Sequence, residues 1–346
     1  MNAEKIKTII RNDSRFSLIG IIIDGIQPVL VAQRGEPGII VEEDLDDLGR
    51  VILNGAPDCS RFEQYDETCK LMDEYNILKS GWVFRTCNLL IREGSEWGEN
   101  VEMLKNYFWF RTRGQLDMYD YGSFSEKEIN SLKESKRDKF FIHYNGHERI
   151  HRLELIDEIF RRGLEENGLI SMLVPIPEKT GPGSSKYPYA REFFDSCPVY
   201  LDVGTKNDKF VSISGYKHKG LRPDNPSFSF PFKHLQETFF QISAETYFYE
   251  KDMLFITEKT YKFIPYHPTI VLGHTGTLKK VREQGFKTFP DMFDESYDEV
   301  EDDKERMTMV VDEIEKFCKL DYDTKMDKYL KSFDNILHNQ NLFFVV

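Results

Sequence analysis

Cysteine is scarce in this chain and is never found as a close pair. The 346 residues include five cysteines, an odd number spread from Cys59 to Cys318, and no C-x-x-C pair occurs. A disulfide framework or a structural zinc site needs grouped cysteines, so the spacing argues against both. We therefore expect a reducing compartment and a cytoplasmic location.

Long hydrophobic runs are also missing. The run LIGIII, from Leu18 to Ile23, is far shorter than the roughly 20 apolar residues that cross a membrane. The amino-terminal stretch MNAEKIKTIIRNDSRF is interrupted by charges within a few residues. These patterns predict neither a signal peptide nor a membrane span.

Basic residues are in deficit: 46 Lys and Arg stand against 59 Asp and Glu, a formal net charge of −13. Long-range attraction to a polyanion is therefore not built into the whole surface. A local basic groove can coexist with an acidic body. The composition thus disfavours nucleic acid as a partner and leaves that possibility open.

What the chain does contain is enough apolar material for a folded protein. Hydrophobic residues make up 40% and aromatics 14% of the 346 residues, and a single core stops growing near roughly 250 to 300 residues, so two domains are expected. The charged stretch at 125–139 is the candidate crossing, with a solvated helix as the alternative reading. We expect an amino-terminal domain at 1–136 and a carboxyl-terminal domain at 137–346.

Strand-like and helical segments alternate, which predicts an α/β fold. LIGIIIDG, at 18–25, has the continuous apolar pattern of a strand covered on both faces. In the second half, the spacing predicts a strand at 139–144, an Asn145-Gly146 turn, a helix over about 148–164 and a new strand at NGLIS. Further strands are predicted at PVYLDVG, KFVSISG, FFQIS and TIVLG. The acidic run at 291–303 is expected to be solvated, with a ligand contact of FDESYD at the strand end as the alternative.

Two strand-to-helix turns carry basic residues. In YNGHERIHR, Arg149 and Arg152 lie in or near the first turn of the predicted helix. Free backbone N–H groups and the helix dipole favour an anion there, and cations at that end suggest that an anion compensates them. The alternative is that both arginines pair with surface acids such as Glu148 and Glu154.

The second turn is FITEKTYKFI, from Phe255 to Ile264. Thr257 is a candidate N-cap, so Glu258 and Lys259 occupy the first turn of a helix. Adjacent helical residues do not face each other, so this pair is poorly placed to neutralise itself. A lysine can bind a phosphate and a glutamate can accept two ribose hydroxyls. A salt-bridged surface helix is the alternative.

No convincing metal-ligand cluster is visible. His143, His147 and His151 are four residues apart, but the Asn145-Gly146 turn separates the first from the other two. A helical pair without a third ligand is usually structural. The D-x-D pair Asp321 and Asp323 falls in a late acidic helical region and is expected to be solvated. We therefore expect no metal and no bound cofactor.

The segment ETYFYEKDMLFITEKTYKFIPYHPTIVLG, together with YNGHERIHRLELI, resembles the donor-binding half of the α-1,3-fucosyltransferases. The two matches occur in the family's order and span about Lys139 to Gly273. The resemblance implies a two-domain GT-B fold with facing Rossmann-like domains and a terminal helix that can pack back on the first domain. It also implies inverting, metal-independent transfer of fucose from GDP-fucose to a glycan hydroxyl.

By this resemblance, Lys259 and Arg149 would bind the donor pyrophosphate and Glu258 the ribose. Arg152 and Thr257, which the two helix starts indicate, are also expected in the nucleotide-binding site. Glu245 and Thr246 match the family's Glu-Asn pair, with Thr in place of Asn. Pro265 inside the helix is a second departure, and residues 1–130 match nothing in the family's acceptor domain.

An inverting transfer also needs a carboxylate that takes the proton of the acceptor hydroxyl. Asp24, at the end of the predicted strand 18–25, is the first candidate, and its alternative reading is an ordinary Asp-Gly turn. Asp117 and Asp120 are its rivals. The expected ligands are a nucleoside-diphosphate sugar and a glycan or other hydroxyl acceptor. Two alternatives remain: a phage-type glycosyltransferase acting on a modified DNA base, and a non-catalytic nucleotide-binding protein.

Overall fold

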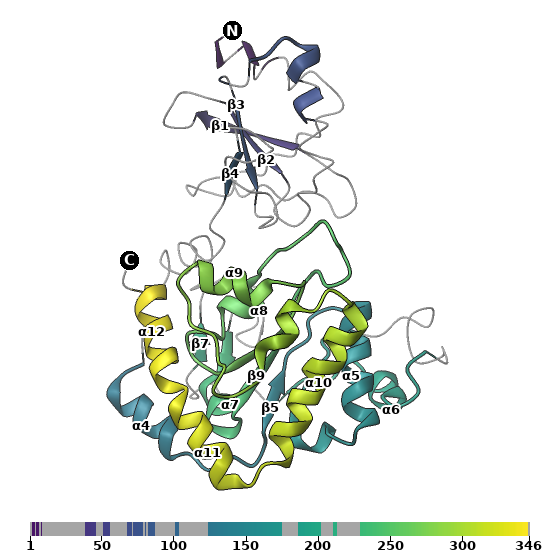
Figure 1. Ribbon diagram of the computed structural model, residues 1–346, viewed down its shortest axis with the longest axis vertical. Coiled ribbons are helices and arrows are strands. Elements are labelled where there is room, and N and C mark those ends of the chain that lie inside the picture. The colour runs from purple at the N-terminus through teal and green to yellow at the C-terminus, as the bar shows by residue number, and fades with distance from the viewer. Residues whose placement is uncertain are drawn as a thin grey trace. The chain divides into compact units, whose positions relative to one another are not determined.

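The computed structural model of the chain divides into two units (Figure 1). One comprises Met1–Asn106 with Glu250–Phe255, and the other comprises Tyr107–Tyr249 with Ile256–Val346. The structure describes residues 124–174, 186–201, 210–212 and 229–344. Before these it describes residues 39–45, 51–55, 82–86, 101–103 and parts of 2–8 and 68–80.

The described part of the first unit contains a four-stranded sheet in the order β1-β2-β3-β4. The β1–β2 pair is antiparallel and the other two pairs are parallel. Its strands are β1 (Ile39–Leu45), β2 (Val51–Gly55), β3 (Trp82–Thr86) and β4 (Val101–Met103). Trp82 and Phe84 point to one face of β3 and are both buried. The strand predicted at 18–25 lies outside the described residues.

The second unit contains a parallel sheet, and this confirms the α/β prediction. Its strand order is β10-β9-β5-β6, and all three neighbouring pairs are parallel. The strands are β5 (Phe141–His143), β6 (Gly168–Ile170), β9 (Phe240–Ala244) and β10 (Thr269–Leu272). Every residue of β5, β9 and β10 is buried, as expected for strands that are covered on both faces.

Helix α5 (Ile150–Arg161) connects β5 to β6. It forms because Leu153, Ile156 and Ile159 recur at helical spacing, and all three are buried. The predicted strand–helix–strand unit is confirmed, with a helix shorter than the predicted range 148–164. The helix stops where Gly163 adopts a positive φ of 65°, a backbone conformation that glycine favours.

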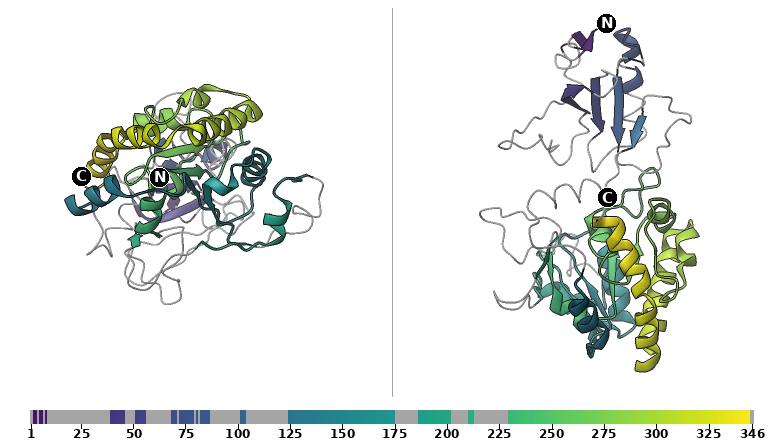
Figure 2. Two further views of the ribbon diagram at one scale, coloured as in Figure 1. Left: turned by 90° about the horizontal axis from the view of Figure 1, so that it is seen from below. Right: turned by 90° about the vertical axis from the view of Figure 1, so that its left-hand side faces the viewer.

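Different helices cover the two faces of this sheet (Figure 2). Alternate residues of β9 point to opposite faces, and Phe240 lies 5.1 Å, centroid to centroid, from Phe317 of α10 (Asp303–Lys319). Gln241 and Ser243 therefore point to the other face. There Ser243 contacts Thr260 of α8 (Glu258–Tyr261). Ser243, on this second face of β9, therefore packs against α8.

Acidic side chains begin several of the helices. Ser125 and Glu128 form a reciprocal capping box at α4 (Glu126–Glu134), so the charged stretch at 125–139 contains a helix. Asp302 caps α10, and Asp321 caps α11 (Tyr322–Lys331) through the Thr324 N–H. The first aspartate of the D-x-D pair therefore caps the N-terminus of a helix.

The acidic run at 291–303 is not wholly solvated, which corrects the expectation for Asp298. This side chain is 3% exposed, and its carboxylate accepts hydrogen bonds from Leu278 N and Lys279 N. These N–H groups begin α9 (Thr277–Glu283), whose own N-cap residue, Gly276, has no side chain to cap them. Burial raises the pKa of Asp298. The chain supplies from η3 (Glu295–Glu299) the cap that α9 lacks.

The remaining described elements complete the second unit. They are η2 (Glu165–Asn167), α6 (Arg191–Asp195), β7 (Phe210–Ser212), β8 (Ser229–Pro231), α7 (Phe232–Glu237) and α12 (Phe333–Phe344). Within the described part of the chain, no helix has both the length and the apolar character that a membrane crossing requires.

Candidate functional site

The candidate site lies at the carboxyl end of the parallel sheet, between β5 and β9. The chain leaves β5 through α5 toward β6 on one side, and leaves β9 through α8 toward β10 on the other. Neighbouring parallel strands whose connections depart in opposite directions form a topological switch point, and open α/β sheets bind ligands in the crevice there. Strand order therefore singles out this position independently of any motif.

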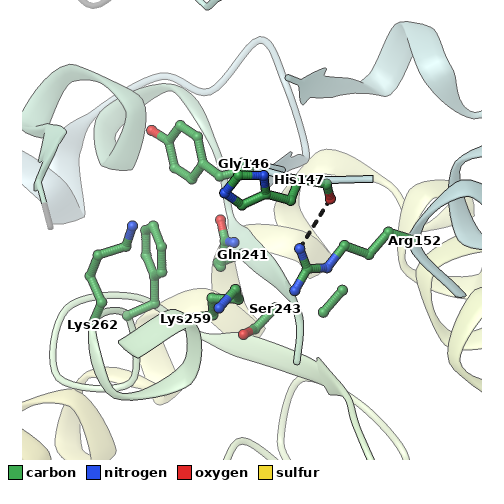
Figure 3. A pocket seen from close by; sticks show the side chains of 10 residues that line it. Gly146, His147, Arg152, Gln241, Ser243, Lys259 and Lys262 are labelled. Atoms are coloured by element: carbon green, nitrogen blue, oxygen red, sulfur yellow. Dashed lines mark hydrogen bonds between the residues drawn. The ribbon is translucent and has the colours of Figure 1, made fainter. Parts of the chain in front are cut away.

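A pocket occupies this position (Figure 3). Its lining residues come from the end of β5, the start of α5, β9 and the α8 region; they are Tyr144, Gly146, His147, Arg152, Gln241, Ser243, Ala244, Lys259, Lys262 and Phe263. The cavity volume is about 80 Å³, well below the roughly 300–1,000 Å³ of sites that enclose a whole small molecule. The described pocket therefore has room for only part of a larger ligand.

The charge of the pocket is opposite to that of the chain. Three of its ten described lining residues are cationic, namely Arg152, Lys259 and Lys262, and none of those ten is acidic. The chain as a whole carries a formal charge of −13. Concave sites with low-dielectric walls focus such a local potential, so the pocket favours an anion.

Lys259 is positioned by the start of α8. Thr257 Oγ1 accepts a hydrogen bond from Lys259 N at 3.2 Å, as an N-cap side chain does. The Lys259 ammonium donates to the hydroxyls of Thr257 and Thr246, at 3.2 and 3.3 Å. Lys259 and Thr246, both predicted site residues, are thus in direct contact, and the lysine remains partly exposed in the pocket.

The buried carboxylate of Glu245 stabilises the turn at the start of α8. Its side chain is 1% exposed, and its carboxylate accepts hydrogen bonds from the Thr257 N–H and from the hydroxyls of Thr257 and Thr260. A buried carboxylate needs such donors because burial strips it of water. The structure therefore places the predicted residue Glu245 behind Thr257 and Thr260, and it is not among the residues that line the pocket.

The two predicted arginines lie in different environments. Arg152 is 2% exposed, lines the pocket, and donates to the carbonyl oxygens of His147 at 3.2 Å and Glu245 at 3.1 Å. It therefore joins the loop after β5 to the loop after β9. Arg149 is exposed, is the N-cap residue of α5, and lies 5.8 Å from the Tyr247 ring centroid. Arg149 is not among the lining residues of the described pocket.

Lys262 is a functional candidate that the sequence reasoning did not select. Its ammonium lies 5.4 Å from the centroid of the Tyr144 ring and 4.9 Å from that of Phe263, and the side chain is 2% exposed. The two rings stack on each other with centroids 5.6 Å apart. The sequence signal that could have selected Lys262 is its position three residues after Lys259, since residues three apart lie on the same side of a helix.

Two of the three histidines considered as metal ligands are structural. His143 and His151 are buried and contact the carbonyl oxygens of Ile242 and Glu245, each at 2.9 Å. Burial lowers the pKa of His143 to about 4 and that of His151 to about 3, so both are neutral at pH 7. His147 is exposed and lines the pocket. Among the described residues, no group of three or more His, Cys, Asp or Glu could hold a metal ion.

Several predicted residues fall outside the described part. Asp24, Asp117 and Asp120, the candidate bases, all lie there, and so does the side chain of Glu258, although that residue begins α8. The described site therefore brings together Lys259, Thr257, Thr246 and Glu245 around one turn and adds Arg152 from the first turn of α5.

The fold and site together define an α/β protein with a cationic pocket at the switch point of a parallel sheet. In comparisons with known proteins, no family model, no curated protein and no solved structure matches the chain.

Proposed function

We propose that this protein is a glycosyltransferase that uses a nucleoside-diphosphate sugar, with the diphosphate bound in the pocket between β5 and β9. The observation that supports this most is the grouping of Arg152, Lys259 and Lys262 around that pocket in a chain of net charge −13. A diphosphate is an anion that such a cluster suits, because lysines act as point charges toward phosphate oxygens. The pocket volume of about 80 Å³ matches one polar portion of the donor.

The cations have a second use in the proposed reaction. As the bond between the sugar and the diphosphate breaks, negative charge develops on the leaving phosphate oxygens. Preorganised donors that face this charge lower the barrier, and losing one such donor commonly costs about 2.7–4 kcal/mol. Lys259 is held ready by Thr257 and Thr246, which supports a role in stabilising the leaving group without a metal ion.

The rest of the proposal comes from the resemblance to the α-1,3-fucosyltransferases. It includes a GDP-sugar as donor, a fucose-like sugar, a glycan hydroxyl as acceptor, inversion at the sugar, and two facing Rossmann-like domains. One carboxylate would take the proton of the acceptor hydroxyl, with Asp24, Asp117 and Asp120 as candidates. A nucleotide-binding protein without transfer activity is the competing function, because the pocket accounts for binding and contains no carboxylate among its described lining residues.

Turnover in the presence of a chelator tests the proposal. A thermal-shift panel of GDP, UDP, CDP and ADP first selects the nucleotide, since a ligand at 100 times its Kd stabilises a protein by about 2.7 kcal/mol. The matching nucleotide sugars are then incubated with and without glycan acceptors, and with EDTA. We expect release of the nucleoside diphosphate that EDTA does not suppress.

Nucleotide binding without any release of sugar would support the non-catalytic alternative. Loss of turnover on chelation, restored by Mg²⁺ or Mn²⁺, would reject the metal-independent mechanism. Binding to duplex DNA that weakens steeply with salt would favour the DNA-modifying alternative. No stabilisation by any of the four nucleotides would reject the proposal.

A further inference from the structure

The floor of the pocket carries two acceptor atoms that a diphosphate alone does not explain. Gln241 and Ser243 are two residues apart on β9, so their side chains point to the same face. Both are nearly inaccessible, with 2% and 1% exposure, and both line the pocket. Figure 3 shows them next to each other, with Lys262 and Arg152 on either side.

The Gln241 amide has a defined orientation. Its Nε2 donates to the carbonyl oxygen of Ile242 at 2.6 Å. A carbonyl oxygen can only accept, so the nitrogen must be on that side and the oxygen on the other. Oε1 is buried and has no hydrogen-bond partner within the described part of the chain. An acceptor buried in this way is costly unless something donates to it.

The Ser243 hydroxyl is oriented by a chain of hydrogen bonds that ends at Glu245. Thr260 Oγ1 donates its single proton to Glu245 Oε1, so in its contact with Ser243 Oγ, at 3.1 Å, Thr260 must be the acceptor. Ser243 therefore uses its own proton on Thr260, and its lone pairs remain for the pocket. The buried carboxylate thus turns Ser243 into an acceptor as well.

Two acceptors on the floor repel the oxygens of a phosphate, which are themselves acceptors. The group that lies against the floor must instead carry a proton to donate. We propose that the floor is a hydroxyl-binding subsite: Gln241 Oε1 and Ser243 Oγ accept hydrogen bonds from a ligand hydroxyl while Lys259 and Lys262 bind an adjacent phosphate. The ligand class is a phosphate ester of a sugar or other polyol.

This inference shares its pocket with the proposed glycosyl transfer and in that sense depends on it. In a nucleoside-diphosphate sugar the hydroxyl belongs either to the transferred sugar or to the ribose. A hydroxyl is the group that a polar site can select most sharply, because a ligand lacking it leaves the buried acceptors unpaired. Gln241 and Ser243 are therefore specificity-determining residues of the site.

The test measures dissociation constants by NMR titration of three probes with the full chain: inorganic phosphate, glucose 1-phosphate and ribose 5-phosphate. We expect at least one ester to bind about 5- to 100-fold more tightly than inorganic phosphate. Preference for glucose 1-phosphate assigns the hydroxyl to the transferred sugar, and preference for ribose 5-phosphate assigns it to the ribose.

Two variants decide whether Gln241 and Ser243 are responsible for the preference for an ester over inorganic phosphate. Gln241→Leu removes the orphaned acceptor, and the Ile242 carbonyl keeps the His143 Nδ1 contact, so the fold should persist. Ser243→Ala removes the second acceptor with a smaller change of volume. We expect Gln241→Leu to abolish most of the ester preference and Ser243→Ala to reduce it, while the affinity for inorganic phosphate is unchanged in both.

An ester preference that is absent in the wild type, or equal in the wild type and both variants, overturns the hydroxyl subsite. A fall in phosphate affinity as large as the fall in ester affinity also overturns it. The outcome is separable from that for glycosyl transfer. Ester preference without turnover of any nucleotide sugar rejects the transfer alone, and turnover without ester preference rejects the subsite alone.

Discussion

Replacing Lys259 by alanine is the most direct perturbation of the pocket. The ammonium contacts two neutral hydroxyls, at 3.2 Å from Thr257 and 3.3 Å from Thr246, and remains partly exposed. A charge-assisted hydrogen bond to a phosphate contributes about 1.5–3 kcal/mol, which corresponds to a roughly 10- to 150-fold change in Kd. We expect Lys259→Ala to weaken binding of a nucleoside diphosphate by this factor.

The fold should tolerate this change. Thr257 still donates its hydroxyl proton to Glu245, so the turn before α8 keeps its buried acceptor. Because Lys259 is partly exposed, its loss should lower the free energy of unfolding by less than about 1 kcal/mol. Urea denaturation of the variant checks this, and a larger loss would mean that Lys259 is mainly structural.

The matched control is Lys331→Ala on α11. Lys331 forms an exposed ion pair with Asp327 at 2.7 Å, and its side chain is 62% exposed. The same Lys-to-Ala chemistry there removes one charge of the chain without touching the pocket. Calorimetric titration of both variants with the best nucleotide of the panel separates a pocket effect from a net-charge effect. Unchanged affinity in Lys259→Ala, or equal losses in both variants, refutes the reasoning.

Two further predictions concern the buried groups that support the site. Glu245→Gln should lower the free energy of unfolding by about 2–3 kcal/mol, because an amide donates where the Thr257 and Thr260 hydroxyls also donate; an unchanged urea midpoint would contradict this. The fold should also lose stability in mild acid, at pH values well above those at which carboxylates become protonated. Burial lowers the pKa of His143 to about 4, that of His151 to about 3, and that of the buried His267 well below its usual value. Near and below about pH 6.5 the unfolded chain therefore binds more protons than the folded chain. The free energy of unfolding falls as the pH decreases toward the pKa values of the folded state, by about 2–4 kcal/mol between pH 7 and 5.5. Equal urea midpoints at those two pH values would show that the three imidazoles do not behave in this way.

Local pattern was enough to predict the elements that flank the pocket. The strand, turn and helix around Asn145-Gly146 follow from a continuous apolar run, a turn pair and apolar residues at helical spacing, all of which act within a few residues. The start of α8 at Thr257 follows equally from local capping chemistry. Lys259 could be selected as a candidate because its position in that turn is set by sequence alone.

The location of the pocket and the set of side chains that meet in it could not be predicted from local pattern. They follow from strand order and burial, which depend on residues far apart in the chain. The order β10-β9-β5-β6 creates the switch point, and no pattern within one segment encodes which strands become neighbours. The same packing takes Asp298 out of an acidic run to cap α9 and puts Glu245 beneath Thr257, 12 positions away. It also turns Gln241, one residue of an apolar-looking strand, toward the pocket that Lys259 enters from α8. Sequence thus determined the local geometry of each turn, and tertiary structure decided which side chains meet there, because burial and charge act through space.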